Sequence, residues 1–275
     1  MNELLAALIL GAVQGVTEFL PISSTAHLVL VPWLFGWTNP LLNSLTFDIA
    51  LHMGTLAALL IYFVREWFLL ARGGITSVLS RNLRGDPWKR LAWLVVLASI
   101  PGAVAGYLLE SAAENAFRSP ALIAVTLIVF GAVLAWAETV GSKRINLMNM
   151  SVFEAAAMGI GQALAIVPGV SRSGGSMTLG MLAGLSRESA ARFSFIMAAP
   201  IIGGAGLKKL KDVLAEGAGG DSGMLMAAGF AASAVVGLLV IHFLLRYLQR
   251  GTLYAFAWYR VALGLVVLAV VFVRG

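Results

Sequence analysis

The sequence has no cysteine and few charged side chains, and each shortage excludes a class of protein. Without cysteine, disulfide bonds, thiolate metal sites and a cysteine nucleophile are all excluded. Charged residues make up 12% of the 275 residues and hydrophobic residues 60%, with a mean hydropathy of +0.91. A soluble domain carries about 25% charged residues. This balance excludes a disordered chain and predicts an integral membrane protein with several spans.

Basic residues exceed acidic ones, with 19 Lys and Arg against 13 Asp and Glu. They fall in short groups between long apolar segments. This distribution favours a protein that faces anionic lipid or an anionic substrate over one that binds nucleic acid. The first residues are acidic at Glu3, and the first apolar run has no cleavage-site pattern, so no signal peptide is expected. We therefore expect the lipid bilayer, and no nucleic acid, as a partner.

The apolar segments are long enough to cross a membrane, which takes about 20 residues of helix. Six of them are expected as spans: Ile49–Val64, Leu91–Leu109, Ser119–Ala137, Phe193–Leu207, Ser222–Leu245 and Ala255–Val273. Leu4–Trp37 and Phe153–Leu185 are also apolar but are interrupted by proline and polar residues. Irregular backbone at membrane depth needs protein or water around it. We expect both to be helix–loop–helix hairpins that enter and leave by the same face.

The two halves of the chain repeat one pattern. Gly11–Gln14 and Pro21–Ser24 in the first half match Gly159–Gln162 and Pro168–Ser171 in the second. Each half has one broken hairpin followed by three spans, so the first half makes an odd number of passes and the second is inverted. The sequence predicts an all-α protein with a single integral membrane domain over residues 1–275. Its repeats cover about 1–140 and 150–275.

Loop charges predict the orientation. Ten Lys and Arg residues lie in the loops expected on one side, within 65–90, 143–144 and 246–250, and four lie in 110–120 and 208–223 on the other. The richer side is expected to be cytoplasmic. Both termini and the entry of the first hairpin then lie outside, and the second hairpin enters from the cytoplasm.

The first hairpin carries ionisable groups at membrane depth, which indicate function. Gln14 and Glu18 lie four residues apart and share a helix face. After Pro21 come the polar residues Ser23, Ser24, Thr25 and His27. Ser24 and His27 have the spacing that lets a hydroxyl pass its proton to an imidazole. The alternative is that Glu18 and His27 only pair with each other, or with Arg172, to hold the hairpins together.

The second hairpin contains a loop of small and hydroxyl residues around one arginine: Ser171, Arg172, Ser173, Gly174 and Ser176. Backbone N–H groups at a helix start, hydroxyl groups and a guanidinium all suit phosphate oxygens. We expect an anion cradle here, facing Glu18 and His27. Of the remaining polar residues, His52 and His242 are expected to be satisfied core histidines, and Arg260 to extend to the membrane interface.

The residues Gln14, Glu18 and FLPISSTAH, together with PGVSRSGG and FSFIMAAPI, resemble the bacterial undecaprenyl pyrophosphate phosphatases, also called bacitracin-resistance proteins. The likeness covers essentially the whole chain. It implies six spans and two re-entrant hairpins, and hydrolysis of undecaprenyl pyrophosphate to the monophosphate that carries peptidoglycan precursors. It also implies the bacterial inner membrane, and a requirement for Mg²⁺ or Ca²⁺. Glu18 and Gln14 would supply oxygens to this cation, although many members have Glu at the position of Gln14.

The expected reaction is phosphoryl transfer. Arg172, with Ser171, Ser173 and nearby N–H groups, holds the terminal phosphate. Ser24, or a water in its place, attacks; His27 takes the proton, and Glu18 orients His27 or binds the cation. Ser23, Thr25, Gly174 and Ser176 complete the phosphate site, which opens to the outer face. A polyprenyl-phosphate carrier or flippase is the alternative function, and a homodimer is one alternative for the oligomeric state.

Overall fold

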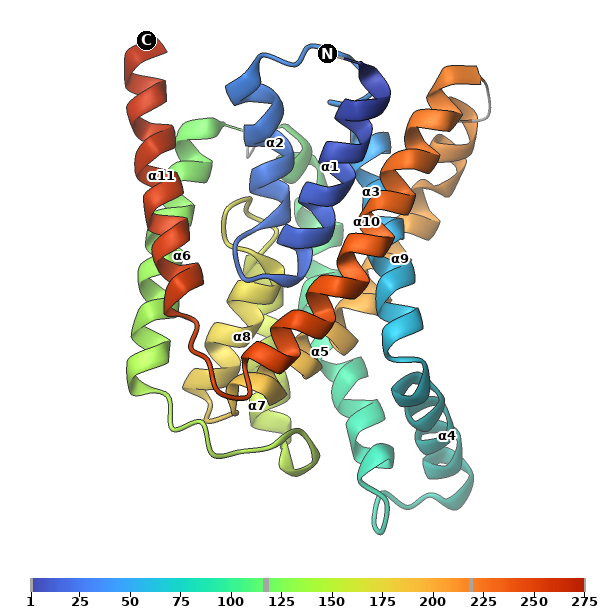
Figure 1. Ribbon diagram of the computed structural model, residues 1–275. Helices are drawn as coiled ribbons and strands as arrows, with labels where there is room; N and C mark the ends of the chain where they lie inside the picture. Colours follow the sequence, from blue (N-terminus) through green and yellow to red (C-terminus); the bar gives the residue numbers. More distant parts are fainter. Residues whose placement is uncertain (1, 116–118, 218–219, 275) are drawn as a thin grey trace.

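The computed structural model describes residues 2–115, 119–217 and 220–274 (Figure 1). These residues form eleven α-helices and one short 3-10 helix: α1 Glu3–Phe19, α2 Ser24–Phe35, α3 Leu45–Tyr62, α4 Val64–Ser80, α5 Pro87–Asn115, α6 Pro120–Val140, η1 Leu147–Asn149, α7 Val152–Leu164, α8 Arg172–Leu182, α9 Arg187–Gly217, α10 Gly220–Tyr247 and α11 Tyr254–Arg274. The all-α class predicted from composition is confirmed.

Six of these helices are long and apolar enough to cross a membrane: α3, α5, α6, α9, α10 and α11. They correspond one for one to the six predicted spans, and most extend a few residues further. Helix α9 begins at Arg187 rather than at Phe193, because the Arg187 guanidinium pairs with the buried carboxylate of Glu138 at the end of α6. A paired charge can lie inside a helix end that apolar length alone would exclude.

The two interrupted regions are helix hairpins, α1–α2 and α7–α8. In Figure 1, α1 and α2 extend from the end of the molecule where the termini lie, and α7 and α8 extend from the opposite end. Their tips meet inside the molecule. The Gly169 N–H donates to Ser23 Oγ at 3.2 Å, and Ser173 Oγ donates to the Leu20 carbonyl at 3.0 Å. This arrangement is compatible with re-entrant hairpins, whose position in a bilayer stays a prediction.

The tips of the two hairpins share one local structure. Ser23 precedes α2 with φ of 75°, and Ser171 precedes α8 with φ of 73°. Each serine hydroxyl accepts a hydrogen bond from the N–H three residues later, as an N-cap does. The pairs Gly11 and Gly159, Gln14 and Gln162, and Ser23 and Ser171 are all 148 positions apart. This agreement supports the predicted repeat, while its boundaries stay a prediction.

Arg260 in α11 holds both tips. It is 0% exposed, so the expectation that it extends to the interface is wrong. Its guanidinium donates to the carbonyls of Pro21 at 3.2 Å, Gly169 at 2.8 Å and Val170 at 2.9 Å. These carbonyls lie outside helices and need a donor that the backbone does not supply. The buried arginine therefore fixes the two tips relative to each other.

The segment 65–90 is not the simple loop expected from its charge, because 64–80 forms helix α4. Leu70, Gly73 and Ser77 are buried on one face, with Gly73 against the backbone of Trp88. The opposite face carries exposed apolar side chains: Val64, Phe68, Ile75, Val78 and Leu79. The sequence signal for this helix is the helical spacing of its apolar residues, which are interspersed with arginines.

Candidate active site

A cavity of about 770 Å³ lies between the hairpin tips and helices α3, α5 and α9. Its wall is largely apolar, with these polar side chains: Glu18, Ser23, Ser24, Thr25, Asp48, His52, Gln162, Ser171, Arg172 and Lys208. From the tips it follows the first half of α3 and the later parts of α5 and α9, toward the end of the molecule that holds the termini (Figure 1). Such a space accepts an apolar chain along its length and a polar group at the tips.

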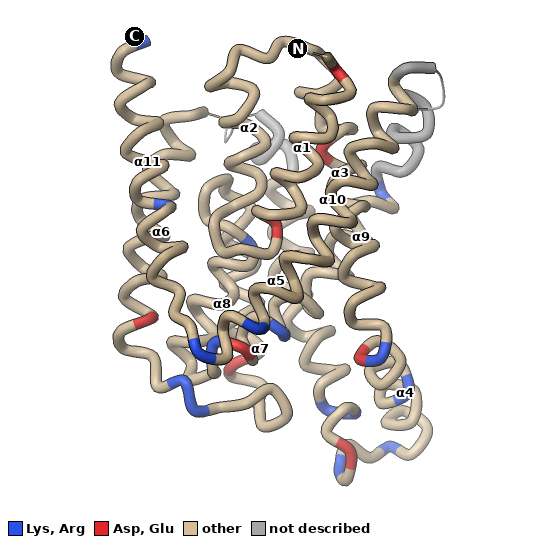
Figure 2. The backbone as a smooth tube through the Cα atoms, in the orientation of Figure 1, with Lys and Arg blue, Asp and Glu red and all other residues tan. Residues whose placement is uncertain are grey.

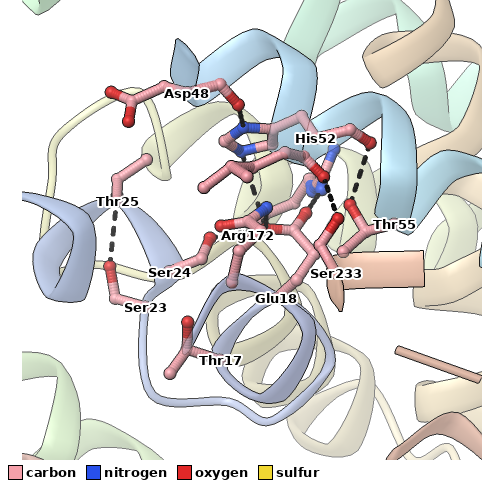
Figure 3. A network of polar contacts seen from close by, with 12 residues as sticks. Thr17, Glu18, Ser23, Ser24, Thr25, Asp48, His52, Thr55, Arg172 and Ser233 are labelled. Atoms are coloured by element: carbon pink, nitrogen blue, oxygen red, sulfur yellow. Dashed lines mark hydrogen bonds and ion pairs between the residues drawn. The ribbon is translucent and has the colours of Figure 1, made fainter. Parts of the chain in front are cut away.

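Glu18 is the centre of the polar contacts (Figure 3). It lies in the last turn of α1 and is only 6% exposed. One carboxylate oxygen, Oε2, accepts from Ser24 Oγ at 2.5 Å and from Gln14 Nε2 at 3.1 Å. The other, Oε1, forms an ion pair with the Arg172 guanidinium. Gln14 and Glu18 share a helix face, as predicted. Glu18 also pairs with Arg172, the contact named in the alternative in which these residues hold the hairpins together.

Ser24 and Arg172 reach Glu18 because each is the first residue of its helix, α2 and α8. The positive ends of both helix dipoles therefore lie at the tips, next to the cavity. Together with the arginine they make this region favourable for an anion. The carboxylate of Glu18 balances part of that charge in the structure described.

The predicted pair of Ser24 and His27 does not form. His27 Nδ1 lies 2.7 Å from the Ser23 carbonyl, and Nε2 lies 2.8 Å from the Tyr259 hydroxyl. The ring also stacks on Tyr259, with centroids 5.7 Å apart. Because both ring nitrogens are engaged and the side chain does not line the cavity, His27 links α2 to α11. The three-residue spacing places both residues on one face but does not determine their partners.

His52 is the histidine of the cavity, and the expectation that it belongs to the core is wrong. Its Nδ1 lies 2.7 Å from the Asp48 carbonyl, and its Nε2 lies 3.6 Å from Glu18 Oε2 (Figure 3). The two ring nitrogens of His52 therefore face two hydrogen-bond acceptors, the Asp48 carbonyl and the Glu18 carboxylate. The signal in the sequence was the four-residue spacing of Asp48 and His52 on an otherwise apolar helix.

The other predicted phosphate-binding residues divide into two groups. Ser23, Thr25 and Ser171 line the cavity. Ser173, Gly174 and Ser176 are buried behind its wall. Ser176 Oγ donates to the Arg172 carbonyl at 2.7 Å and lies 2.7 Å from Ser194 Oγ, so it supports the arginine from behind. Direct contact of this second group with phosphate stays a prediction.

The side-chain oxygens of Glu18 and Gln14 could contribute ligands to a cation, but they do not form a complete site by themselves. Within the described part of the chain, no three His, Asp or Glu side chains gather as metal ligands. Gln14 Oε1 is buried and has no hydrogen-bond partner there, next to the Glu18 carboxylate. A carboxylate and an amide oxygen fit a hard cation such as Mg²⁺, which takes its remaining oxygens from phosphate and water.

Comparisons with known proteins show which family the chain belongs to. The family model of bacitracin resistance protein BacA matches residues 7–266. The undecaprenyl-diphosphatase of Moorella thermoacetica is 49% identical over 270 residues, which cover 98% of both chains. The undecaprenyl-diphosphatase of Pelotomaculum thermopropionicum is 50% identical over 268 residues, covering 98% of this chain and 97% of the relative. With this match over nearly its whole length, the chain belongs to the BacA family of bacitracin resistance proteins.

Proposed function

We infer that this chain is an undecaprenyl-diphosphatase: it hydrolyses undecaprenyl diphosphate to undecaprenyl phosphate and phosphate. Relatives that match it over 98% of its length carry this name. The observation that carries the inference is the buried carboxylate of Glu18, which contacts both Ser24 and Arg172 at the end of an apolar cavity. A carrier also needs the anion site, but it has less use for a hydroxyl held against a carboxylate, so this contact favours the enzyme.

Arg172 binds the terminal phosphate in this proposal. Its guanidinium, at the start of α8, combines a planar fork of donors with the positive end of a helix dipole. Phosphate competes with Glu18 for the arginine. Binding of the substrate therefore weakens the ion pair of Glu18 with Arg172 and leaves the carboxylate ready to accept a proton. As charge develops on the transferring phosphoryl group, Arg172 stabilises it.

Glu18, rather than His27, is the general base. Ser24 Oγ already donates to Glu18 Oε2, so the carboxylate is placed to take the proton as the oxygen attacks. The oxygen of Ser24, or of a water in its place, bonds to the terminal phosphorus. The bond from that phosphorus to the bridging oxygen breaks, and undecaprenyl phosphate leaves. Where Ser24 is the nucleophile, water then cleaves the phosphoserine to release phosphate.

A divalent cation, Mg²⁺ or Ca²⁺, fits beside Glu18 and Gln14, and when bound it would neutralise charge on the diphosphate. The protein alone offers few ligands, so we expect the cation to bind together with the substrate. Ser171 and Thr25 lie on the cavity wall with hydroxyl groups that suit the remaining phosphate oxygens.

We place the protein in the bacterial inner membrane, with the cavity open to the outer face. Figure 2 shows Lys and Arg gathered mainly at the end of the molecule opposite the termini. The positive-inside rule makes that end cytoplasmic. The cavity extends toward the other end, which supports substrate entry from the outer side of the membrane and laterally from lipid. A homodimer stays a prediction, which the mass of the purified protein in detergent would test.

The first experiment is phosphate release from undecaprenyl diphosphate by the purified protein in detergent. We expect release with Mg²⁺ or Ca²⁺, loss of release with chelator, and loss in Glu18→Gln and Arg172→Ala. Folding of each variant is checked by its thermal unfolding transition. No release by folded wild-type protein with metal present would contradict the function. Transport of labelled lipid by a variant that cannot hydrolyse it would support the carrier instead.

A further inference from the structure

Gln162 is a buried polar side chain whose amide has no partner within the described residues. It is 4% exposed, and neither Oε1 nor Nε2 makes a hydrogen bond. It lies on the wall of the cavity, in the last turn of α7. Buried polar groups in native structures are hydrogen-bonded in the great majority of cases, and an exception calls for a ligand or water. The mechanism above makes no use of this residue.

The repeat explains why the amide is free. Gln162 lies nine residues before Ser171, as Gln14 lies nine residues before Ser23. Gln14 donates to Glu18, four residues later on α1. The residue four positions after Gln162 is Ile166, which offers no acceptor. The second hairpin therefore has the matching glutamine but lacks the carboxylate that pairs with it in the first hairpin.

Helix α5 leaves room for the amide at the cavity wall. Gly102 faces Gln162, and a Cβ atom at that position would lie 3.0 Å from Nε2. Both residues line the cavity, as does Arg172 on the other arm of the same hairpin. A space-filling role alone needs only an apolar side chain of this size. A buried, unpaired amide on the wall of the cavity that also contains Arg172 indicates a binding role.

We propose that Gln162 binds the second phosphate of the diphosphate, the one that stays on the prenyl chain, by donating from Nε2 to a non-bridging oxygen. The proposal rests on the function inferred above. Arg172 and the tips provide for one phosphate, and the second phosphate needs a donor of its own. A neutral amide can donate to this phosphate, and unlike a second cationic side chain it would not form an ion pair with Glu18. Gln162 thereby distinguishes a diphosphate from a monophosphate.

The test compares inorganic pyrophosphate and inorganic phosphate as inhibitors of the full-length enzyme in detergent. The variant is Gln162→Leu, and Gln249→Leu, at an exposed glutamine after α10, is the matched control. We expect the inhibition constant of pyrophosphate, and the KM for undecaprenyl diphosphate, to rise about 10-fold or more in Gln162→Leu. The inhibition constant of inorganic phosphate should stay within about twofold of wild type. Phosphate binds at Arg172, and the variant loses a hydrogen bond only to the second phosphate. The control matches wild type.

Thermal unfolding separates a binding role from a structural one. Replacing an unsatisfied amide by leucine removes a desolvation cost, so the Tm of Gln162→Leu should equal or exceed that of wild type. A lower Tm, an equal loss for both inhibitors, or no loss for either would overturn the proposal. Calorimetric binding of pyrophosphate and phosphate repeats the comparison without turnover. A wild-type protein that binds pyrophosphate but hydrolyses nothing would contradict the function, whereas weaker binding of pyrophosphate alone by Gln162→Leu in the calorimeter would still support the assignment of Gln162.

Discussion

Ser24 and Arg172 occupy the same position in two related hairpins, and both contact the carboxylate of Glu18. Each is the first residue of a helix, and each follows a serine with positive φ. The two tips thus deliver different chemistry to one point: a hydroxyl from α2 and a guanidinium from α8. Glu18 comes only from the first hairpin. The site therefore exists only where the tips meet, which ties activity to their relative position.

Replacing Glu18 tests the proposed base. Glu18→Gln keeps the shape but removes the charge that accepts the proton and pairs with Arg172. We expect phosphate release to fall by about 10²- to 10⁴-fold, the range for loss of a general base. Turnover of the variant within tenfold of wild type, in folded protein, would show that another group takes the proton.

Removing the hydroxyl of Ser24 tests the nucleophile. Because Ser24 Oγ lies 2.5 Å from the carboxylate, we expect Ser24→Ala to lose about 100-fold or more in phosphate release. Labelled phosphate should be trapped on wild-type protein by acid quench, and not on the variant. Near-normal turnover of Ser24→Ala would eliminate the covalent route and leave water as the attacking group.

His27 and Tyr259 form a structural contact, so their variants should share an effect on stability. His27→Ala loses the hydrogen bonds to the Ser23 carbonyl and to Tyr259. We therefore expect the free energy of unfolding to fall by about 1–3 kcal/mol. Tyr259→Phe should lower the Tm by a smaller amount. The check is thermal unfolding of both variants beside the pH dependence of their activity. An unchanged Tm in His27→Ala, with an altered pH profile, would restore His27 as the base.

Arg260 should be essential although it does not line the cavity. Arg260→Met leaves three tip carbonyls without a donor, and hydrogen bonds to a charged group contribute about 1.5–3 kcal/mol each. We expect a much lower Tm and loss of activity. Arg260→Lys should not rescue either, because an ammonium cannot reproduce the planar fork. Arg274→Met, on the same helix but exposed, is the control and should change little. Equal Tm values for Arg260→Met and Arg274→Met would contradict the role assigned to Arg260.

The sequence predicted the features that depend on local pattern. The six spans follow from apolar length, and the hairpins follow from Pro21 and Pro168 within apolar regions. The features that it missed depend on partners distant in the chain. Arg260 serves carbonyls 239, 91 and 90 residues away. No period or spacing encodes such partners.

The two histidines show the same limit at the site. Helical spacing put His27 beside Ser24 and left His52 on an apolar helix. Only the packing of α3 on α1 brings His52 to Glu18, and only α11 supplies Tyr259 to His27. Helix α4 was missed for a different reason. Its arginines led to the segment being counted as a charged loop, although the apolar residues between them have helical spacing.

The presence of Ile166 where the first hairpin has Glu18 has a consequence for stoichiometry. A molecule made of two matched halves could hold two equivalent reaction centres, one on each side of its internal axis. Here the two halves differ at the matched positions, with Glu18 against Ile166 and Ser24 against Arg172, so we expect a single centre in each chain. Titration with pyrophosphate should therefore saturate at one equivalent per chain.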